Sequence, residues 1–337
     1  MTVLVTGAAG FLGAHVTDLL QSLGESPRVL VHPADDAERL ELAGLEVRRG
    51  DIADPGALWP AVRGIERVLH CAARTGPWGP SAEYERTNVR GVETLVRVAV
   101  AAGVERIVHV SSVTVHGNDL RGAGDESAPL REEPNPYSRS KVAGEQLIAR
   151  MVRDERAPVT VVRPGWIYGP RDVSSFARIA RSIEQHKMVL VGSGDNHVPL
   201  IYVRDVARGI LLASEAENTM GRCYLLVNDE SVTQRAYLTA IAQELGAPPP
   251  TRRIPYKLAV GIGAIAERLG HLVGRKEPPP VMRFGMQMLG GENRFSIARA
   301  RCELGFAPQV DLAEGVKRSV DWYRTAGVLT DARRAAA

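Results

Sequence analysis

The feature that most constrains the fold is an alternation of short apolar runs with helix-patterned segments over the first half of the chain. The runs are rich in β-branched residues and read VLVTG, RVLVH, LEVRRGD, RVLHCAA, RIVHVSSV and VTVVRPG. Strands that alternate with helices form βαβ units and a parallel sheet covered by helices on both faces. Because these runs are continuously apolar, they suit strands that are buried on both sides. The sequence therefore predicts an α/β chain with a doubly wound parallel sheet.

The pattern loosens beyond residue 163, where loops such as RPGWIYGPRD and VGSGDNHVPL separate the helical segments. A chain of 337 residues also exceeds the usual size of one domain. We expect residues 1–162, joined by about 200–225, to form a Rossmann-type nucleotide-binding domain. Residues 163–199 and 226–337 are expected to form a smaller, mostly C-terminal α/β substrate lobe.

Charge and cysteine content exclude several classes of function. The 42 basic and 39 acidic side chains are scattered without a basic block, so no nucleic-acid surface is expected. The cysteines, Cys71, Cys223 and Cys302, are too few and too widely spaced for a disulfide framework, and no cluster offers a metal site. A reducing cytoplasm fits this pattern best.

No segment predicts membrane insertion. The N-terminus MTVLVTG has no basic region and runs directly into a structural motif, so we do not expect a signal peptide. The longest apolar stretch, LAVGIGAIA at 258–266, is about half of a membrane span. Loose contact of this stretch with a membrane surface remains an alternative.

A glycine-rich loop follows the first predicted strand in VLVTGAAGFLGAHV. Gly7, Gly10 and Gly13 lie between that strand and an apolar helix, with a spacing that departs from G-x-G-x-x-G by one residue. Glycines there permit a tight turn and let the backbone approach a pyrophosphate, which then sits at the helix N-terminus. In a βαβ context this loop predicts dinucleotide binding.

A tyrosine and a lysine lie four residues apart in NPYSRSKVAGEQL, at 135–147. Asn135 is a suitable N-cap and Pro136 suits the first helical position, so Tyr137 and Lys141 should share one face of a helix near its N-terminus. Both the ammonium and the helix dipole would favour the phenolate. We therefore expect the pKa of Tyr137 to be lowered toward working pH, as a general acid or base requires. Plain packing is the alternative for an isolated pair.

Together, these motifs resemble an extended short-chain dehydrogenase/reductase over nearly the whole chain. TGAAGFLG matches the family's TG-x-x-G-x-x-G, TNVRG resembles its Asn-Val-x-Gly, and VHVSSVTVHG resembles its serine strand. RPGWIYGP, LIYVRDVARG and LGFAPQVDLAEGVKRSVDWY resemble later landmarks. HCAARTGPWG resembles the loop of the 3β-hydroxysteroid-dehydrogenase-related branch.

The resemblance implies a set of site residues. The catalytic residues would be Ser112, Tyr137 and Lys141. Cofactor contacts, in addition to Tyr137 and Lys141, would come from Gly7, Ala9, Gly10, Phe11, Leu12, Gly13, His32, Asp51, Ile52, Ala72, Ala73, Arg74, Asn88, Pro164, Gly165 and Ile167. Substrate contacts would come from Trp78, Thr114, Trp166 and Tyr202, and no metal is implied.

The implied mechanism is hydride transfer at a nicotinamide coupled to proton exchange at Tyr137. Ser112 would hydrogen-bond the reacting oxygen, while Lys141 would lower the pKa of the phenol and hold the nicotinamide ribose. Ser112 could instead only cap or bond the backbone, and Ser111 is the rival if the alignment shifts by one. His116 is interpreted as a packed pocket residue.

The end of the second strand, RVLVHPADD, bears on the choice between NAD and NADP. An acid there would bond the ribose 2′-OH of NAD, whereas an arginine would favour a 2′-phosphate. The sequence offers neither, since Val31 and His32 occupy those places and Asp35 and Asp36 follow in the loop. We expect an NAD(P) cofactor, with a slight preference for NADP.

Three classes of function compete. A keto-reductase or secondary alcohol dehydrogenase with a largely apolar substrate is favoured over a nucleotide-sugar epimerase or dehydratase. Where those enzymes bind a diphosphate with polar residues, this chain has Trp166 and the apolar run Val198, Pro199 and Leu200. A non-catalytic NAD(P)-binding regulator is disfavoured, because it would not need the complete catalytic set. The resemblance also implies a homodimer that pairs through the helices after Asn88 and around Tyr137.

Overall fold

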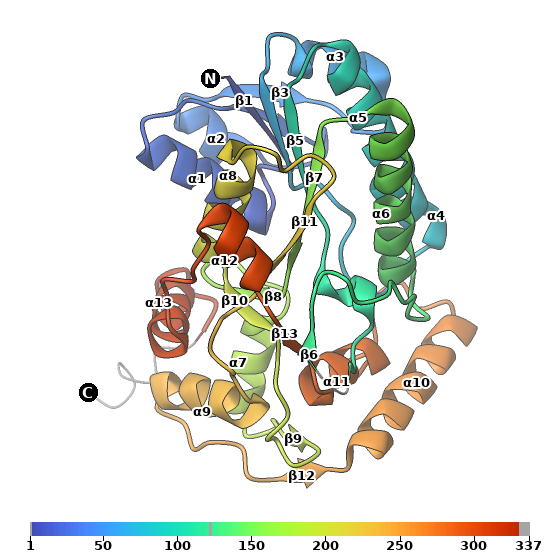
Figure 1. Ribbon diagram of the computed structural model, residues 1–337. Coiled ribbons are helices and arrows are strands. Elements are labelled where there is room, and N and C mark those ends of the chain that lie inside the picture. Colours follow the sequence, from blue (N-terminus) through green and yellow to red (C-terminus); the bar gives the residue numbers. More distant parts are fainter. Residues whose placement is uncertain (1, 121–122, 330–337) are drawn as a thin grey trace.

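The computed structural model describes residues 2–120 and 123–329, and its largest element is a seven-stranded parallel sheet (Figure 1). The strand order is β11-β7-β5-β4-β1-β2-β3. The strands are β1 (Val3–Thr6), β2 (Arg28–Val31), β3 (Glu46–Arg49), β4 (Arg67–His70), β5 (Arg106–Val110), β7 (Val159–Pro164) and β11 (Cys223–Leu226). All six predicted runs form strands of this sheet, so the predicted α/β architecture is confirmed. β3 differs from the expectation of burial on both sides, because it is the edge strand and is mostly exposed.

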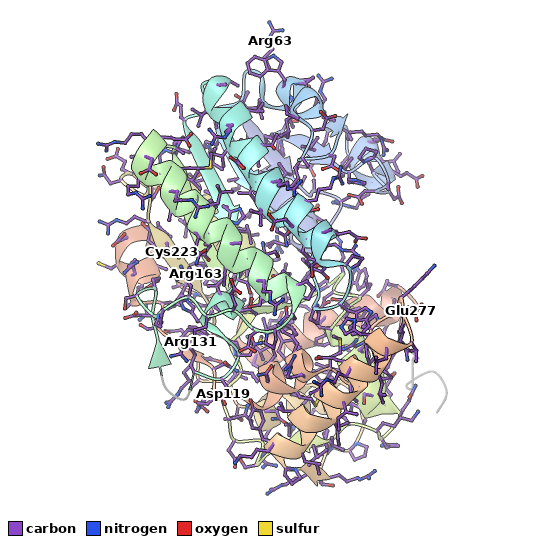
Figure 2. The ribbon with its side chains drawn as sticks, turned by 90° about the vertical axis from the view of Figure 1, so that its right-hand side faces the viewer. Arg63, Asp119, Arg131, Arg163, Cys223 and Glu277 are labelled. Carbon is purple, nitrogen blue, oxygen red and sulfur yellow. The ribbon has the colours of Figure 1, made fainter. Side chains whose placement is uncertain are left out.

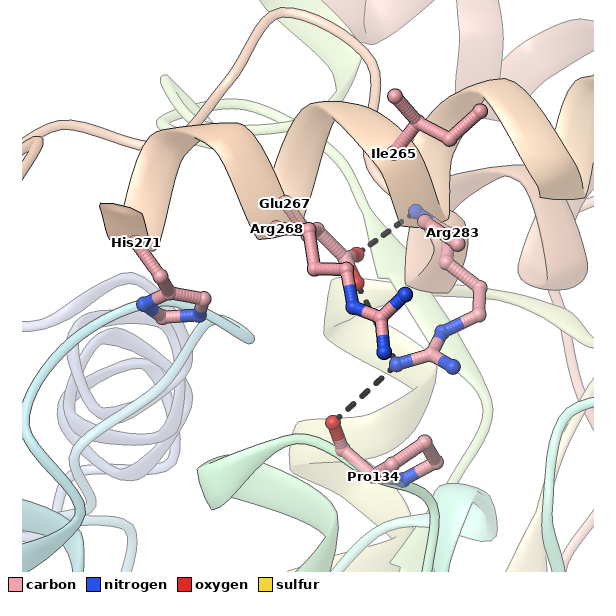
Figure 3. A pocket seen from close by; sticks show the side chains of 7 residues that line it. Pro134, Ile265, Glu267, Arg268, His271 and Arg283 are labelled. Carbon is pink, nitrogen blue, oxygen red and sulfur yellow. Dashed lines mark hydrogen bonds and ion pairs between the residues drawn. The ribbon is translucent and has the colours of Figure 1, made fainter. Parts of the chain in front are cut away.

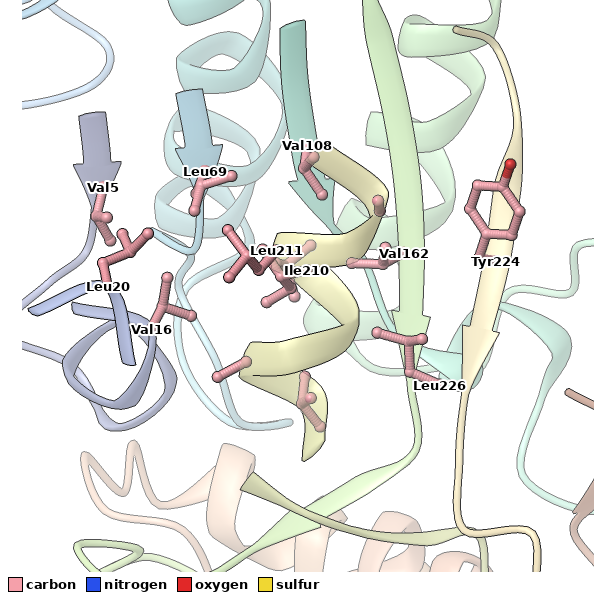
Figure 4. Packing of buried hydrophobic residues seen from close by; sticks show 14 of the residues in the cluster. Val5, Val16, Leu20, Leu69, Val108, Val162, Ile210, Leu211, Tyr224 and Leu226 are labelled. Carbon is pink, nitrogen blue, oxygen red and sulfur yellow. The ribbon is translucent and has the colours of Figure 1, made fainter. Parts of the chain in front are cut away.

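Helices cover both faces of the sheet. On one face, α1 (Phe11–Ser22) and α8 (Val203–Glu215) pack against each other and against the strands. Figure 4 shows this core, in which Ile210 and Leu211 of α8 lie among side chains of the central strands, including Leu69 and Val108. The other face is covered by α3 (Pro55–Val62), α5 (Val92–Ala101) and α6 (Pro136–Glu155).

A second core lies below the sheet and is rich in aromatic residues. It forms around α7 (Phe176–Glu184), α9 (Gln234–Leu245), α13 (Leu312–Thr325) and the parallel pair of β8 (Trp166–Tyr168) with β10 (Leu200–Tyr202). Tyr168, Phe176, Tyr237 and Tyr323 are fully buried within it. α10 (Tyr256–Leu272) and α11 (Arg283–Gly290) pack together at its outer side (Figure 1).

The remaining elements are short and connect these layers. They are α2 (Glu38–Leu42), α4 (Ser81–Glu85), the π-helical turn η1 (Arg86–Gly91), the 3₁₀ turn η2 (Val113–His116), β6 (Ala123–Gly124), β9 (Leu190–Val191), β12 (Arg253–Ile254), β13 (Arg294–Phe295) and α12 (Ala298–Leu304).

The topology determines where a ligand can bind. β1 lies between β2 and β4: β2 and β3 are added on one side of β1, and the later strands are added on its other side. The strand order therefore reverses direction at β1. In open parallel sheets a crevice forms outside the carboxyl ends of the strands at such a reversal. The glycine loop follows β1 at this edge, and the segment beginning at Ser111 follows β5 at the same edge.

Candidate active site

Tyr137 and Lys141 lie in the first two turns of α6. Asn135 caps this helix, since its side-chain oxygen accepts from the backbone N–H of Ser138 at 2.8 Å, and Pro136 occupies the first turn as predicted. The Lys141 side chain is buried, with its Nζ 2.9 Å from the carbonyl oxygen of Val110 at the end of β5. Nζ is also 6.0 Å from the centre of the Tyr137 ring. The helix start therefore places the phenol and the ammonium beside the carboxyl end of β5.

Ser112 and its neighbour Ser111 point to different partners. The Ser112 hydroxyl forms a hydrogen bond with Tyr137, accepts one from the Thr114 hydroxyl at 3.0 Å and caps the 3₁₀ turn by accepting from the Thr114 N–H at 3.2 Å. Ser111, in contrast, donates to the carboxylate of Glu145 in the interior. Successive side chains of an extended segment point to opposite sides, so only one of the two serines can reach the phenol. Ser112 both caps the turn and contacts Tyr137.

The pKa of Tyr137 departs from the sequence-based expectation. Burial raises its pKa to about 12, and the hydrogen bond with Ser112 opposes that rise only in part. The expected lowering toward working pH is therefore wrong for the chain without a ligand, because desolvation of the phenolate outweighs the hydrogen bond with Ser112. Burial also lowers the pKa of Lys141 to about 8, against a smaller raising effect of Glu145.

A buried ionic network lies directly behind these residues. The Glu145 carboxylate accepts from the Arg163 guanidinium at 2.9 Å to Nε and 2.5 Å to Nη2, and both side chains are nearly inaccessible. Arg163 Nη1 also lies 3.0 Å from His116 Nε2 and 3.2 Å from the Glu126 carbonyl oxygen. His116 is thus a packed residue, as interpreted. Sequence reasoning missed the Glu145–Arg163 pair, although Glu145 follows Lys141 by four residues and so lies on the same helix face.

Two histidines of neighbouring strands lie close to Lys141. His70 of β4 and His109 of β5 have ring centres 5.2 Å apart, and His70 Nδ1 is 2.7 Å from the Thr6 hydroxyl. Burial, reinforced by the charge of Lys141, lowers the pKa of His70 to about 3 and that of His109 well below its usual value. Both rings are therefore neutral, and Lys141 carries the positive charge of this cluster.

The glycine loop fits the phosphates of a dinucleotide. Gly7 has a φ of +68°, and a Cβ there would lie 2.7 Å from the Ala72 backbone; a Cβ on Gly13 would lie 2.2 Å from the Gly7 carbonyl oxygen. Gly10 precedes α1 without any side-chain cap, so the first backbone N–H groups of the helix face the loop. This uncapped N-terminus is suited to a pyrophosphate. The backbone of Ala9, Phe11 and Leu12 belongs to the same turn.

Charged residues gather where the adenosine end of such a cofactor would lie. Asp51 pairs with Arg86 at 2.6 Å and lies 3.7 Å from His32, while Ile52 beside it is buried. Asp35, which follows β2 in the loop, accepts from the backbone N–H of His32 at 3.2 Å. Arg49, which sequence reasoning missed, is next to this loop and donates to the Asp35 carbonyl oxygen at 3.1 Å.

Asn88 connects the loop after β4 to α6. Its amide exchanges two hydrogen bonds with the backbone of Arg74, at 2.8 and 2.9 Å, and donates to the Ser140 hydroxyl at 2.8 Å. It is buried, so its observed contacts are structural, and they fix the backbone of Ala72 and Ala73 beside the glycine loop. The Arg74 side chain pairs with Glu83 at 3.1 Å.

The segment after β7 passes very close to the backbone of a second segment, at Pro199. A Cβ on Gly165 would lie 2.0 Å from the Pro199 carbonyl oxygen, so only glycine fits between Pro164 at the end of β7 and β8. Ile167 of β8 is half-buried and packs against the core of the sheet. This arrangement holds β8 and β10 together next to the carboxyl end of β7.

The predicted substrate contacts separate into two groups. Trp166 is half-buried, with Nε1 3.1 Å from the Ser175 hydroxyl, and Trp78 stacks on His271 of α10 at 4.1 Å between ring centres. Thr114 and Tyr202 are buried: Thr114 supports Ser112, and Tyr202 packs edge-on against Tyr168 in the second core. Tyr202 therefore presents almost no surface to a ligand.

A pocket of about 400 Å³ opens beside the start of α6 (Figure 3). Its lining comes from α10, α11 and the segment before α6, and comprises Pro134, Ala264, Ile265, Glu267, Arg268, His271 and Arg283. Arg283 connects its walls, because its backbone N–H donates to Glu267 at 2.8 Å and its side chain donates to the Pro134 carbonyl oxygen at 3.4 Å. Its lining does not include Ser112, Tyr137 or Lys141. Phe284, next to Arg283, lies edge-on to Tyr137 at 6.5 Å between ring centres, which brings α11 to the catalytic candidates.

Comparison with known proteins identifies the family. Residues 3–225 match the model of the NAD dependent epimerase/dehydratase family. The chain belongs to this family. It is 32% identical to a 2-alkyl-3-oxoalkanoate reductase from Stenotrophomonas maltophilia, and the alignment covers 94% of this chain and 98% of the reductase. It is also 30% identical to a 3 beta-hydroxysteroid dehydrogenase/Delta 5-->4-isomerase from Mycobacterium tuberculosis, and that alignment covers 95% of this chain and 90% of the relative.

A solved structure extends the comparison to the fold. A double mutant of the dTDP-glucose 4,6-dehydratase of Streptomyces venezuelae, solved with NAD bound, superposes with a TM-score of 0.77 and 27% identity, covering 96% of this chain and 97% of that one. The expected likeness to extended short-chain dehydrogenases and to the 3β-hydroxysteroid-dehydrogenase-like branch is confirmed. The protein is an NAD(P)-dependent oxidoreductase of the extended short-chain type. Among the described residues, no helix is long and apolar enough to cross a membrane.

Proposed function

We propose that this protein is a keto-reductase or secondary alcohol dehydrogenase that acts on a largely apolar small molecule through Tyr137, Lys141 and Ser112. The observation that carries the proposal is the convergence of three side chains at the carboxyl end of β5. The Tyr137 phenol hydrogen-bonds with Ser112, and Lys141 is buried beside it. A phenol and a hydroxyl that meet in this way can both contact one substrate oxygen.

The chain's own residues supply binding and proton handling. The bound nicotinamide supplies the hydride chemistry that the protein side chains lack. Tyr137 exchanges a proton with the substrate oxygen, and Ser112 donates a hydrogen bond to that oxygen. Lys141 holds the ribose hydroxyls on the nicotinamide side and stabilises the phenolate as it forms. The glycine loop holds the pyrophosphate at the N-terminus of α1.

The surroundings of Tyr137 favour an apolar substrate. Phe284 lies against the phenol ring, and Trp78 and Trp166 are the predicted contacts that retain accessible surface. Ligand sites of this kind are lined mainly by apolar and aromatic groups, with a few polar groups at the reacting centre. The names of the reductase and steroid-dehydrogenase relatives support the same substrate class.

A nucleotide-sugar epimerase or dehydratase is the second candidate, since the family description includes both activities. The arginines available for a diphosphate are already engaged in part: Arg171 pairs with Asp18 at 2.7 Å and Arg74 with Glu83 at 3.1 Å. Val198 and Leu200 are buried, so the run with Pro199 offers no polar clamp. Isothermal titration with UDP and dTDP sugars in the presence of cofactor should show no binding. Micromolar affinity for either sugar would favour this second candidate.

For the cofactor we propose a slight preference for NADP over NAD. His32 and Arg49 flank the loop after β2, and both side chains are about half exposed. An arginine in that place can bond a 2′-phosphate. The Asp35 carboxylate at His32 opposes this preference. Fluorescence titration of both cofactors tests it, and Arg49→Gln should weaken NADP more than NAD if the preference holds.

The division of the chain, its assembly and its location are also proposals. We propose residues 1–162 with about 200–225 as the cofactor domain, and residues 163–199 with 226–337 as the substrate lobe. A homodimer through α5 and α6, which lie side by side in Figure 2, is proposed together with a cytoplasmic location. A monomeric mass by light scattering at micromolar concentration would contradict the dimer.

The decisive experiment is a panel of ketones and secondary alcohols that differ in apolar bulk. Oxidation or reduction of the nicotinamide is followed by absorbance with each cofactor. We expect kcat/KM to rise with the apolar bulk of the substrate, because more apolar surface leaves water. Turnover confined to small, strongly polar compounds would contradict the proposed substrate class.

A further inference from the structure

The outer face of α10 carries a continuous stripe of exposed apolar side chains. They are Leu258, Ile262, Ile265, Leu269, Leu272 and, just past the helix, Val273, with exposed fractions between 42% and 81%. Their spacing of three and four residues places them on one side of the helix. A surface helix of a globular protein normally turns its apolar stripe toward the core and its polar side outward. α10 does the opposite.

Packing on the inner side prevents α10 from rotating the stripe inward. A Cβ on Gly263 would lie 2.4 Å from the backbone nitrogen of Arg283, and one on Gly270 would lie 3.0 Å from the Trp78 ring. Glu267 accepts from the Arg283 backbone at 2.8 Å. Gly263 and this hydrogen bond thus seat α10 closely against α11, while Gly270 seats it against Trp78, and the large apolar residues are left outside. Figure 1 shows α10 at the periphery of the molecule.

The same segment concentrates positive charge. Residues 251–277 contain six basic and two acidic residues, a net charge of +4, whereas the whole chain has a net charge of +3. Of the two acids, Glu267 is half-buried and pairs with Arg283 at 3.4 Å. Lys257 and Arg268 are exposed and stand eleven residues apart, so they lie on the same flank of the stripe.

We propose that the outer face of α10 binds the surface of a membrane that contains acidic lipids, with the helix lying in the plane of the interface. An exposed apolar stripe flanked by lysine and arginine is the pattern by which helices bind anionic bilayers without crossing them. The apolar side chains enter the acyl boundary while the cations contact the headgroups. The pocket beside α6 borders this face, because Ile265 and Arg268 line it together with Ala264, Glu267 and His271.

Charge argues for a membrane rather than a second copy of the chain. A twofold interface brings the same surface of both subunits together, so α10 would face α10. Two segments of net charge +4 would then repel each other, whereas an acidic bilayer attracts both the charges and the stripe. The homodimer proposed above uses α5 and α6 instead.

The test measures binding to vesicles and requires no turnover, so its outcome does not depend on the proposed function. The 337-residue chain is sedimented with vesicles of phosphatidylcholine alone and with vesicles of equimolar phosphatidylcholine and phosphatidylglycerol. We expect binding to the mixed vesicles that weakens as salt is added, because the cations contribute through screened electrostatics.

Two sets of variants separate the apolar and the charged contributions. Leu258→Gln, Leu269→Gln and Leu272→Gln together should reduce binding to the mixed vesicles by at least about tenfold, since three apolar side chains no longer leave water. Leu42→Gln is the matched control, because Leu42 on α2 is 81% exposed, as is Leu272. Lys257→Gln with Lys276→Gln should weaken binding to the mixed vesicles and reduce its dependence on salt.

Several results would overturn the proposal. One is the absence of binding to either vesicle. Another is an equal loss for Leu42→Gln and the triple variant. A third is a fall in mass, seen by light scattering, in the triple variant alone, which would identify α10 as a contact between copies of the chain. Unchanged circular dichroism of the triple variant excludes unfolding as the cause of lost binding.

Discussion

Replacing Glu145 with glutamine should destabilise the protein far more than its position on a long helix would suggest. The substitution keeps the shape of the side chain and removes its charge. Among the described residues, Glu145 is the only carboxylate that accepts a hydrogen bond from the Arg163 side chain, and the two side chains are 5% and 7% exposed. The variant therefore leaves a buried guanidinium without its counter-ion.

The magnitude follows from the cost of an uncompensated buried charge. Removing one partner of a buried ion pair typically costs about 3–5 kcal/mol of folding stability, because the remaining charge is desolvated and has no counter-ion. The amide oxygen of glutamine can still accept one hydrogen bond from Arg163 or Ser111, so the lower part of this range applies. Loss of the carboxylate should also lower the pKa of Lys141 further, since Glu145 acts to raise it.

Urea unfolding followed by circular dichroism measures the change. Glu145→Gln should lower the midpoint of unfolding with little change in the dependence on urea. Glu155→Gln is the matched control on the same helix: Glu155 pairs with Arg97 at 2.9 Å, but that pair is exposed, so its loss should be barely detectable. Glu145→Leu combined with Arg163→Met should recover much of the stability, because no unpaired charge remains. Equal losses for Glu145→Gln and Glu155→Gln would refute the reasoning.

Three further predictions concern the site. Tyr137→Phe should retain cofactor affinity in a fluorescence titration and lose about 10²- to 10⁴-fold in kcat, since it removes only the exchangeable proton; a near wild-type kcat would contradict the assignment. Lys141→Met should raise the free energy of unfolding by up to about 3 kcal/mol below pH 8, because burial lowers the pKa of Lys141 from 10.5 to about 8 and the charged form is penalised there. That gain in the free energy of unfolding should shrink as the pH rises toward 10.5. Denaturant unfolding at several pH values across this range tests the prediction, and a gain that does not depend on pH would contradict it. Gly13→Ala should lower the midpoint of thermal unfolding and weaken cofactor binding, because its Cβ would lie 2.2 Å from the Gly7 carbonyl oxygen; unchanged values of both would show that the loop adjusts freely.

The local features of this chain could be predicted from the sequence, because they depend on residues that lie close together along it. The six apolar runs became strands, and Asn135 with Pro136 marked the start of α6, since caps and periodicity act within a few residues. The glycine loop was recognised for the same reason. Its steric origin, the contact of Gly13 with Gly7, spans only six residues.

Packing between distant segments decided the rest. The pKa of Tyr137 rises because the folded chain removes the phenol from water, and neither Lys141 nor the helix start reveals that burial. The different hydrogen-bond partners of Ser111 and Ser112 likewise depend on which groups the folded chain places beside each hydroxyl. The Glu145–Arg163 pair and the outward apolar stripe of α10 are settled by elements that meet only after folding. A sequence pattern specifies which face of a strand or helix is apolar, whereas the neighbours packed against that face determine whether it is buried, charged or left in water.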